Sequence, residues 1–279
     1  MNKTDYLNNC HVKNFVSWLA QNHDQLNFNY ANFQATTFPS VLDKYDWGRL
    51  KTFDSNNSHL EILKTGLSQS ILQNDDTGFL IGCMKVQKWG GTENGNLKKL
   101  LNMHVDGTKF KKNEFHSIIK YFEAIKLEIN SMLIGTGDIN NIPTDIHLNS
   151  GFSKIYSLLV DKFIIFDSRV SAALGCLVNL YISSNNITLD DNFKACLFFP
   201  WLPAKSKPNR RKAGYILNSN ATSLNGADYT SWNIKASWLV EKIVKDLKLF
   251  PTDNDNLKIR KLEPALFMIG YDINKHKLV

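Results

Sequence analysis

Lys154 and Asp167 lie near each other in the middle of the chain and carry side chains that can do chemistry. The apolar pattern predicts a short helix around Lys154, followed by a turn at residues 161–162 and a buried extended run. A second helix is predicted to begin at Asp167, whose carboxylate then accepts backbone N–H bonds and faces the positive end of the helix dipole. Both effects keep Asp167 ionised. An anion at this position can stabilise a developing glycosyl cation.

Each of these residues also has a simpler interpretation. Asp167 can be only a helix cap, and taken alone a cap is more common than a catalytic group. Lys154 can extend its amine into solvent, as helix lysines normally do. The pair is more informative than either residue, because a lysine on one helix and an aspartate at the start of the next can converge on one cleft.

Helical periodicity dominates the chain, so we expect an all-α fold. Helices are predicted at about residues 9–22, from Pro39, after a cap at Asn57 or Ser58, at 79–89, and at 115–129. A polar, Asn-rich link is expected after the first helix, and residues 163–166 are the one brief strand candidate. The clearest stripe follows Asp167 and consists of Val170, Ala173, Leu174, Leu177, Val178 and Tyr181.

The domain organisation follows from this pattern. Residues 1–279 are expected to form one helical domain, or two helical lobes with a weak boundary at 135–149, where Gly, Asn and Pro interrupt the periodicity.

Composition excludes several classes of protein. The 279 residues contain 43% hydrophobic residues and four scattered cysteines, so disorder, a zinc site and an iron–sulfur cluster are not expected. No metal or cofactor motif is present, and the cysteines indicate buried free thiols in a reducing compartment. The absence of an apolar signal core or a long apolar run predicts a cytoplasmic protein without membrane contact.

The net charge of +7 is compatible with a partner that carries phosphates. The densest basic run comprises Lys205, Lys207, Arg210, Arg211 and Lys212, and is either a phosphate-binding segment or a solvated loop. Ser168 and Arg169, in the first turn after Asp167, suit a phosphate, although Arg169 can equally pair with an acidic neighbour. Further candidate DNA contacts are Trp89, Trp232, Asn233 and Trp238. The tryptophans can instead be core residues, and Trp238 can contact another helix rather than stack on a base.

Four stretches together carry a family resemblance. They are Lys88-Trp89-Gly90-Gly91 with Asn96-Leu97, then Ser153-Lys154 with Ile165-Phe166-Asp167-Ser168-Arg169-Val170, then Trp232-Asn233-Ile234-Lys235-Ala236-Ser237-Trp238-Leu239, and finally Leu262-Glu263-Pro264-Ala265-Leu266-Phe267-Met268-Ile269-Gly270-Tyr271. Over residues 79–271 and in the same order, the chain resembles helix-hairpin-helix DNA glycosylases, nearest the bacterial 8-oxoguanine-glycosylase-like branch.

The resemblance implies a helical fold that extrudes a nucleotide from the duplex and cleaves its N-glycosidic bond. It implies that Asp167 stabilises the sugar cation or deprotonates the nucleophile, and that the Lys154 amine attacks the anomeric carbon and can form a Schiff base. The sequence departs from the family in two ways. The glycine-rich hairpin is reduced to Gly151, and the lysine-to-aspartate spacing is shorter, so Lys154 can be a pocket residue and Lys162 is the alternative amine.

The leading hypothesis is therefore a monomeric DNA glycosylase that acts on double-stranded DNA containing a modified base. The short lysine helix and the missing hairpin favour a wide pocket for a bulky base, such as glucosylated 5-hydroxymethylcytosine in phage DNA, which implies antiviral defence. The alternative substrate is 8-oxoguanine, in DNA repair. Two other classes stay open, namely a non-catalytic DNA-binding module on the same scaffold and a helical interaction protein.

Overall fold

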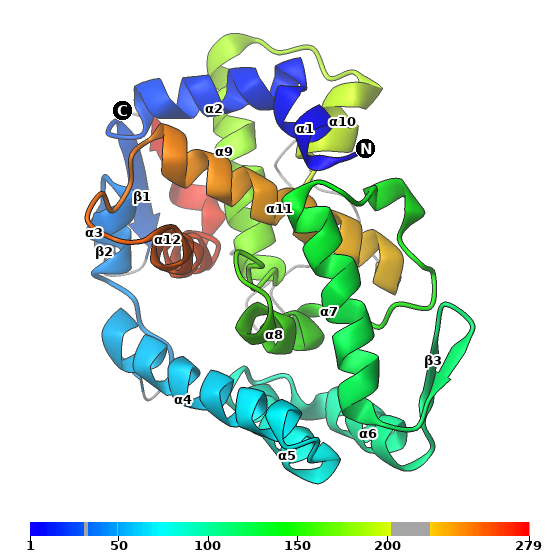
Figure 1. The fold of residues 1–279 in the computed structure, drawn as a ribbon. Helices are drawn as coiled ribbons and strands as arrows, with labels where there is room; N and C mark the ends of the chain where they lie inside the picture. The colour runs from blue at the N-terminus through cyan, green and yellow to red at the C-terminus, as the bar shows by residue number, and fades with distance from the viewer. Residues whose placement is uncertain (31–32, 49, 202–223, 279) are drawn as a thin grey trace. The chain divides into compact units, whose positions relative to one another are not determined.

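The computed structural model describes residues 1–30, 33–48, 50–201 and 224–278 (Figure 1). Helices make up 66% of the protein, which confirms the expected predominance of helix. The α-helices among the described residues are α1 (Lys3–Asn8), α2 (Cys10–Asn22), α3 (Phe38–Leu42), α4 (Phe53–Leu72), α5 (Asp76–Trp89), α6 (Glu93–Val105), α7 (Ile118–Ile134), α8 (Ser150–Leu159), α9 (Ser168–Asn185), α10 (Asp191–Leu197), α11 (Gly226–Asp246) and α12 (Asp255–Ile269). The short elements are β1 (Leu26–Tyr30), β2 (Phe33–Ala35), β3 (Thr108–Phe110), β4 (Asn113–Phe115), β5 (Lys277–Leu278) and the 3-10 turns η1 (Ile139–Asn141) and η3 (Ile273–Lys275).

The chain divides into two units and passes between them several times. Unit 1 comprises Met1–Asn2, Asp54–Ile165 and Leu224–Ile234, and unit 2 comprises Lys3–Phe53, Phe166–Ser223 and Lys235–Val279. The irregular stretch 135–149, which we considered as a weak boundary, lies inside unit 1.

Unit 1 is built around a cluster of aromatic rings. The ring centroid of Phe122, on α7, lies 5.2 Å from that of Phe79 on α5 and 5.0 Å from that of Tyr156 on α8. Phe152 of α8 also stacks on Phe122, at 6.0 Å. All four side chains are buried. The cluster therefore holds α5, α7 and α8 together and sets the position of the helix that carries Lys154.

Helix α9 is the central helix of unit 2. Its predicted apolar stripe is confirmed, because every residue of the stripe is buried. The opposite face is buried as well. A Cβ atom at Gly175 would lie 2.5 Å from the ring of Trp201, so only glycine allows this close approach. The first turn of α9, with Asp167 as its cap, is thus fixed by packing on more than one side.

Two small antiparallel sheets modify the all-helical expectation. One has the strand order β2-β1-β5, with Phe28 opposite Ala35, and the other is the β3-β4 hairpin. We expected a polar link after α2. That expectation is wrong, because β1 follows α2 there, and its fully buried Leu26 and Phe28 alternate with the partly buried Asn27 and Asn29. Residues 163–166 are buried but form no strand.

Local signals placed several helix ends correctly. Helix α5 ends at Trp89 before Gly90, as predicted, whereas it begins at Asp76, earlier than expected, with the Asp75 side chain as its cap. Helix α4 instead begins at Phe53, upstream of the expected cap at Asn57 or Ser58. Asn57 and Ser58 therefore lie inside the helix. The first turn of α4 carries Asp54, whose negative charge interacts favourably with the positive end of the helix dipole.

Candidate functional site

Asp167 caps α9 as expected. Its Oδ1 atom accepts hydrogen bonds from the backbone N–H groups of Arg169 and Val170, at 2.8 and 3.0 Å. The side chain is partly exposed. Among the described residues, no further hydrogen bond to this carboxylate is found. Ser168, the first residue of α9, is also partly exposed.

Arg169 is held by aromatic rings of unit 2. Its guanidinium carbon lies 4.3 Å from the ring centroid of Phe267 and 4.6 Å from that of Tyr271. The ring of Trp47 contributes a third contact at 5.6 Å. A guanidinium over aromatic faces is attracted by their quadrupoles and is stabilised by roughly 0.5–2 kcal/mol per favourable pair. The predicted phosphate contact of Arg169 would therefore use a guanidinium that the protein has already oriented.

The end of α12 touches the backbone of this first turn. A Cβ atom at Gly270 would lie 1.7 Å from the carbonyl oxygen of Arg169, which no side chain tolerates. Gly270 is the C-cap of α12, and two of the rings around Arg169 flank it, Phe267 in the last turn of the helix and Tyr271 directly after the cap. Glycine at this position thus allows α12 to bring its aromatic residues against Arg169.

Charged groups surround a buried tyrosine in the same unit. Burial raises the pKa of Tyr45, and the carboxylates of Glu263 and Asp167 add to this effect, while Arg260 and Arg169 oppose it. The Arg260 Nη1 and Glu263 Oε2 atoms form an ion pair at 3.6 Å, and the Glu263 side chain is buried. The Tyr45 hydroxyl therefore stays protonated and neutral, in an environment that includes Asp167.

Lys154 is buried, contrary to the simple expectation of a solvated helix lysine. Only 5% of the residue is exposed, and its Nζ atom donates a 2.9 Å hydrogen bond to the carbonyl oxygen of Ser150. Its alkyl chain packs on Gly90, where a Cβ atom would lie 2.3 Å from Lys154 Cδ. The glycine after Trp89 thus provides the space that the lysine stem fills.

A buried polar network holds the helix that carries Lys154. The Gln87 side chain is fully buried, and its Nε2 atom donates to the carbonyl oxygen of Gly151 at 3.0 Å. Its Oε1 atom accepts from Thr92 Oγ1 at 2.7 Å and from Asn96 Nδ2 at 3.1 Å. Asn149 continues the network, because its Nδ2 atom donates to Asn96 Oδ1 at 3.0 Å.

The same Asn149 side chain caps α8 through Oδ1, which accepts from two backbone N–H groups of the first turn. Our sequence analysis missed this network. A usable signal was present, because Gln87 is one turn from the buried residue Cys83 and so lies on the buried side of α5.

The remaining predicted residues have different outcomes. The Trp89 indole N–H donates to Asn56 Oδ1 at 2.9 Å, which joins α5 to α4. Trp232 is partly buried. Asn233 and Trp238 are fully buried, and Trp238 lies 5.5 Å from the ring of Tyr6. Trp238 therefore contacts another helix, which was the second interpretation of this residue. The predictions that Trp238 stacks on a base and that Asn233 contacts DNA are wrong, because neither side chain reaches solvent.

The two candidate catalytic residues lie in different units, and the predicted basic run lies outside the described residues. Lys154 belongs to unit 1 and Asp167 to unit 2, so their joint action stays a prediction. The basic run Lys205, Lys207, Arg210, Arg211 and Lys212 lies outside the described residues. Lys162, the alternative amine, occupies the turn between α8 and the buried run with a φ of 63°.

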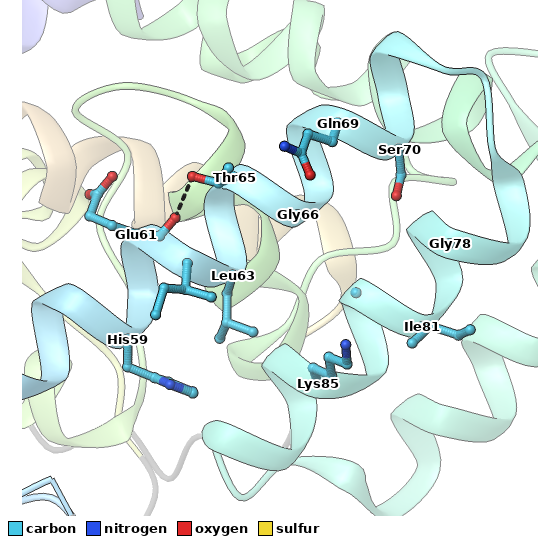
Figure 2. A pocket seen from close by; sticks show the side chains of 12 residues that line it. His59, Glu61, Leu63, Thr65, Gly66, Gln69, Ser70, Gly78, Ile81 and Lys85 are labelled. Atoms are coloured by element: carbon cyan, nitrogen blue, oxygen red, sulfur yellow. Dashed lines mark hydrogen bonds between the residues drawn. The ribbon is translucent and has the colours of Figure 1, made fainter.

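A groove of about 800 Å³ between α4 and α5 contains none of the predicted site residues. Figure 2 shows His59, Glu61 and Lys85 around it, with Leu63 and Ile81 as apolar lining. Because neither Lys154 nor Asp167 lines this groove, it is not the predicted catalytic site.

The described part of the chain has neither a metal-ligand cluster nor a helix that could span a membrane. There, no three His, Cys, Asp or Glu side chains gather as metal ligands would. None of the described helices combines the length and the apolar character of a membrane-spanning segment.

Comparisons of the chain with protein-family models, curated proteins and solved structures found no match. The resemblance to DNA glycosylases accordingly rests on the sequence motifs around Lys154 and Asp167 and on the other three stretches.

Proposed function

We propose that the protein is a DNA glycosylase that excises a modified base from double-stranded DNA. The observation that carries this proposal is the burial of Lys154, with its stem against Gly90 and its amine at the first turn of α8. Lysine is rarely buried without a specific role, and a lysine amine that meets C1′ in its neutral form is a nucleophile. The partly exposed, ionisable cap Asp167 supplies the second group that the reaction needs.

The proposed chemistry assigns one role to each residue. The carboxylate of Asp167 stabilises positive charge on the sugar as the C1′–N bond breaks and the base leaves with the bonding electrons. The neutral amine of Lys154 forms the new C1′–Nζ bond and loses a proton. The nitrogen lone pair then forms the C=N bond of a Schiff base as the C1′–O4′ bond breaks, and O4′ takes up a proton. If Lys154 only lines the pocket, water attacks C1′ instead and the enzyme has no lyase step.

The finer fold assignment is a glycosylase-like helical fold with a degenerate helix-hairpin-helix. Helix α7 ends at Gly135, and an irregular segment with η1 leads to Asn149, which caps α8 directly. Helix α8 has 10 residues. A short lysine helix without a glycine-rich hairpin supports a more open pocket, so we propose a bulky base such as glucosylated 5-hydroxymethylcytosine, with antiviral defence as the role. The alternative substrate is 8-oxoguanine.

The test uses duplexes that contain 8-oxoguanine, 5-hydroxymethylcytosine or its glucosylated form, scored for abasic sites. We expect the wild-type protein, as a monomeric cytoplasmic enzyme, to excise the glucosylated base. Asp167→Asn keeps an N-cap and should retain the fold, but it should lose most excision. Wild-type excision by this variant would make Asp167 a structural cap. Excision of 8-oxoguanine alone would contradict the defence role, and DNA binding without excision would indicate a non-catalytic module.

Borohydride trapping tests the lysine. We expect a covalent protein–DNA adduct that Lys154→Ala abolishes and that the control Lys162→Ala retains. An active wild-type enzyme that forms no adduct would be monofunctional. An adduct that disappears only in the control variant would assign the amine to Lys162.

A further inference from the structure

A second basic cluster in unit 1 lies outside the candidate catalytic residues. The Nζ atom of Lys99, on α6, lies 3.0 Å from Nδ1 of His147, which precedes the cap of α8. The same amine lies 6.0 Å from the ring centroid of Phe152, in the first turn of α8. Both basic side chains are partly exposed. Two groups that can each carry a positive charge are therefore in contact at the start of this helix.

The contact with Lys99 determines the tautomer of neutral His147. Lysine ammonium can only donate, so the Nδ1 atom of His147 must accept, and the ring proton of neutral His147 then resides on Nε2. The donors that remain on the pair are the other ammonium hydrogens of Lys99 and the Nε2–H group of His147.

Among the described residues, Asp145 is the one carboxylate with an electrostatic effect on the pair, and it acts on His147. Asp145 is the acidic group nearest in the sequence, and its Oδ2 atom accepts from the backbone N–H of Lys111 at 2.8 Å. Tyr121 of α7 faces the ring of His147 at 6.1 Å between centroids. Burial raises the pKa of Tyr121, so this neighbour stays neutral.

We propose that Lys99 and His147 form a binding site for a phosphate group, and that its ligand is a phosphodiester of the DNA backbone. The identity of the ligand as DNA rests on the proposed function, whereas the site itself rests on the geometry of the pair. A phosphate oxygen accepts from both side chains at once and offsets the repulsion that two adjacent cations would feel.

The pair also predicts a proton linkage. Burial lowers the pKa of His147, and the neighbouring Lys99 lowers it further, while Asp145 opposes both effects. Burial also lowers the pKa of Lys99. A bound phosphate favours the charged form of each group, so binding raises the pKa of His147 and is accompanied by proton uptake. The added proton goes to Nδ1, so the hydrogen bond from Lys99 is exchanged for hydrogen bonds from both groups to the phosphate.

The first experiment titrates the wild-type protein with inorganic phosphate and follows the His147 ring nitrogens by NMR. We expect saturable shifts and an increase in the His147 pKa. The variant Lys99→Met keeps an unbranched side chain of similar length but removes the charge, and it should lose these shifts while unfolding at the wild-type temperature. The matched control is Lys98→Met, which removes an exposed charge from the neighbouring position of α6.

The second experiment measures binding of an unmodified DNA duplex at several salt concentrations. We expect Lys99→Met to weaken binding and to reduce the salt slope by about one, with a smaller effect of Lys98→Met. Equal effects of the two variants, or no His147 shift with phosphate, would overturn the site. Phosphate binding with unchanged duplex affinity would overturn DNA as the ligand. Because the duplex carries no modified base, the site can hold even if no base is excised.

Discussion

The Nε2 atom of Gln87 donates a 3.0 Å hydrogen bond to the carbonyl oxygen of Gly151, which joins α5 to the first turn of α8. This contact connects two segments far apart in the sequence, and both ends are buried. The segment after Gln87 contains Gly90, against which the stem of Lys154 packs. The hydrogen bond therefore fixes both the helix that carries the candidate nucleophile and the surface on which this lysine rests.

Replacing Gln87 with leucine tests this arrangement. Gln87→Leu leaves the Gly151 carbonyl and the side chains of Thr92 and Asn96 without their partner. We expect the free energy of unfolding to decrease by about 1–3 kcal/mol, because buried polar groups without hydrogen bonds are costly. Chemical denaturation measures the change. Gln73→Leu, at an exposed position after α4, is the control and should change stability by less than about 0.5 kcal/mol. Equal effects of both variants would contradict the role of Gln87.

Two glycine-to-alanine changes should have opposite signs. A Cβ atom at Gly151 would lie 2.0 Å from Asn96 Nδ2 and 2.7 Å from Gln87 Oε1, so Gly151→Ala must displace the network and should destabilise the protein. At Gly66, within α4, nothing lies within 4 Å of the added atom. Gly66→Ala should therefore stabilise the protein by about 0.5–1 kcal/mol, because alanine loses less conformational entropy in a helix. Thermal unfolding of both variants checks the predicted order, and destabilisation by Gly66→Ala would contradict it.

A double-mutant cycle tests the stacking of Arg169 on Phe267. Arg169→Lys keeps the charge but loses the planar group that stacks, and Phe267→Leu removes the ring. If the contact stabilises the start of α9, unfolding measurements should give a coupling energy of about 0.5–2 kcal/mol. Additive effects of the two substitutions would show that the contact contributes nothing. A salt slope for DNA binding that falls by about one in Arg169→Gln, which removes the charge, would instead support the phosphate role of this arginine.

The pH dependence of stability should include a term from His276. Its Nε2 atom lies 2.7 Å from the carbonyl oxygen of Ile269, and its Nδ1 atom accepts from the backbone N–H of Asn29 at 3.2 Å. This arrangement requires the neutral ring. Burial lowers the His276 pKa below its usual value of 6.5, although the hydrogen bond to Ile269 opposes the shift.

The sign follows from proton binding. Below pH 6.5 the unfolded chain binds a proton at His276 that the folded protein does not, so stability is complete above this pH and decreases as the pH falls toward the lowered value. His276→Gln should flatten this part of the profile by up to about 1.4 kcal/mol per pH unit. The control His116→Gln changes an exposed histidine. An unchanged profile in His276→Gln would show that the His276 pKa is the same in the folded and unfolded states and would contradict the prediction.

The sequence alone determined features that depend on neighbouring residues. The cap at Asp167 and the buried stripe of α9 could be predicted, because helix periodicity and side-chain-to-backbone hydrogen bonds involve residues within one or two turns. The end of α5 at Gly90 follows from the same local rules. The strand β1 was missed although its alternation is local, because its length is short and its partner β5 lies at the other end of the chain.

Only the tertiary structure decided the surroundings of the candidate residues. The burial of Lys154 depends on Gly90 and on a network that starts at Gln87, and no periodicity in α8 encodes either contact. The rings around Arg169 come from segments far apart in the sequence, near Trp47 and at the end of α12. Such contacts form because folding buries apolar surface and then requires each enclosed polar group to find a partner. Local sequence therefore specifies the position of a residue on its helix. Packing between distant segments decides whether its side chain contacts solvent, a hydrogen-bond partner or an aromatic ring.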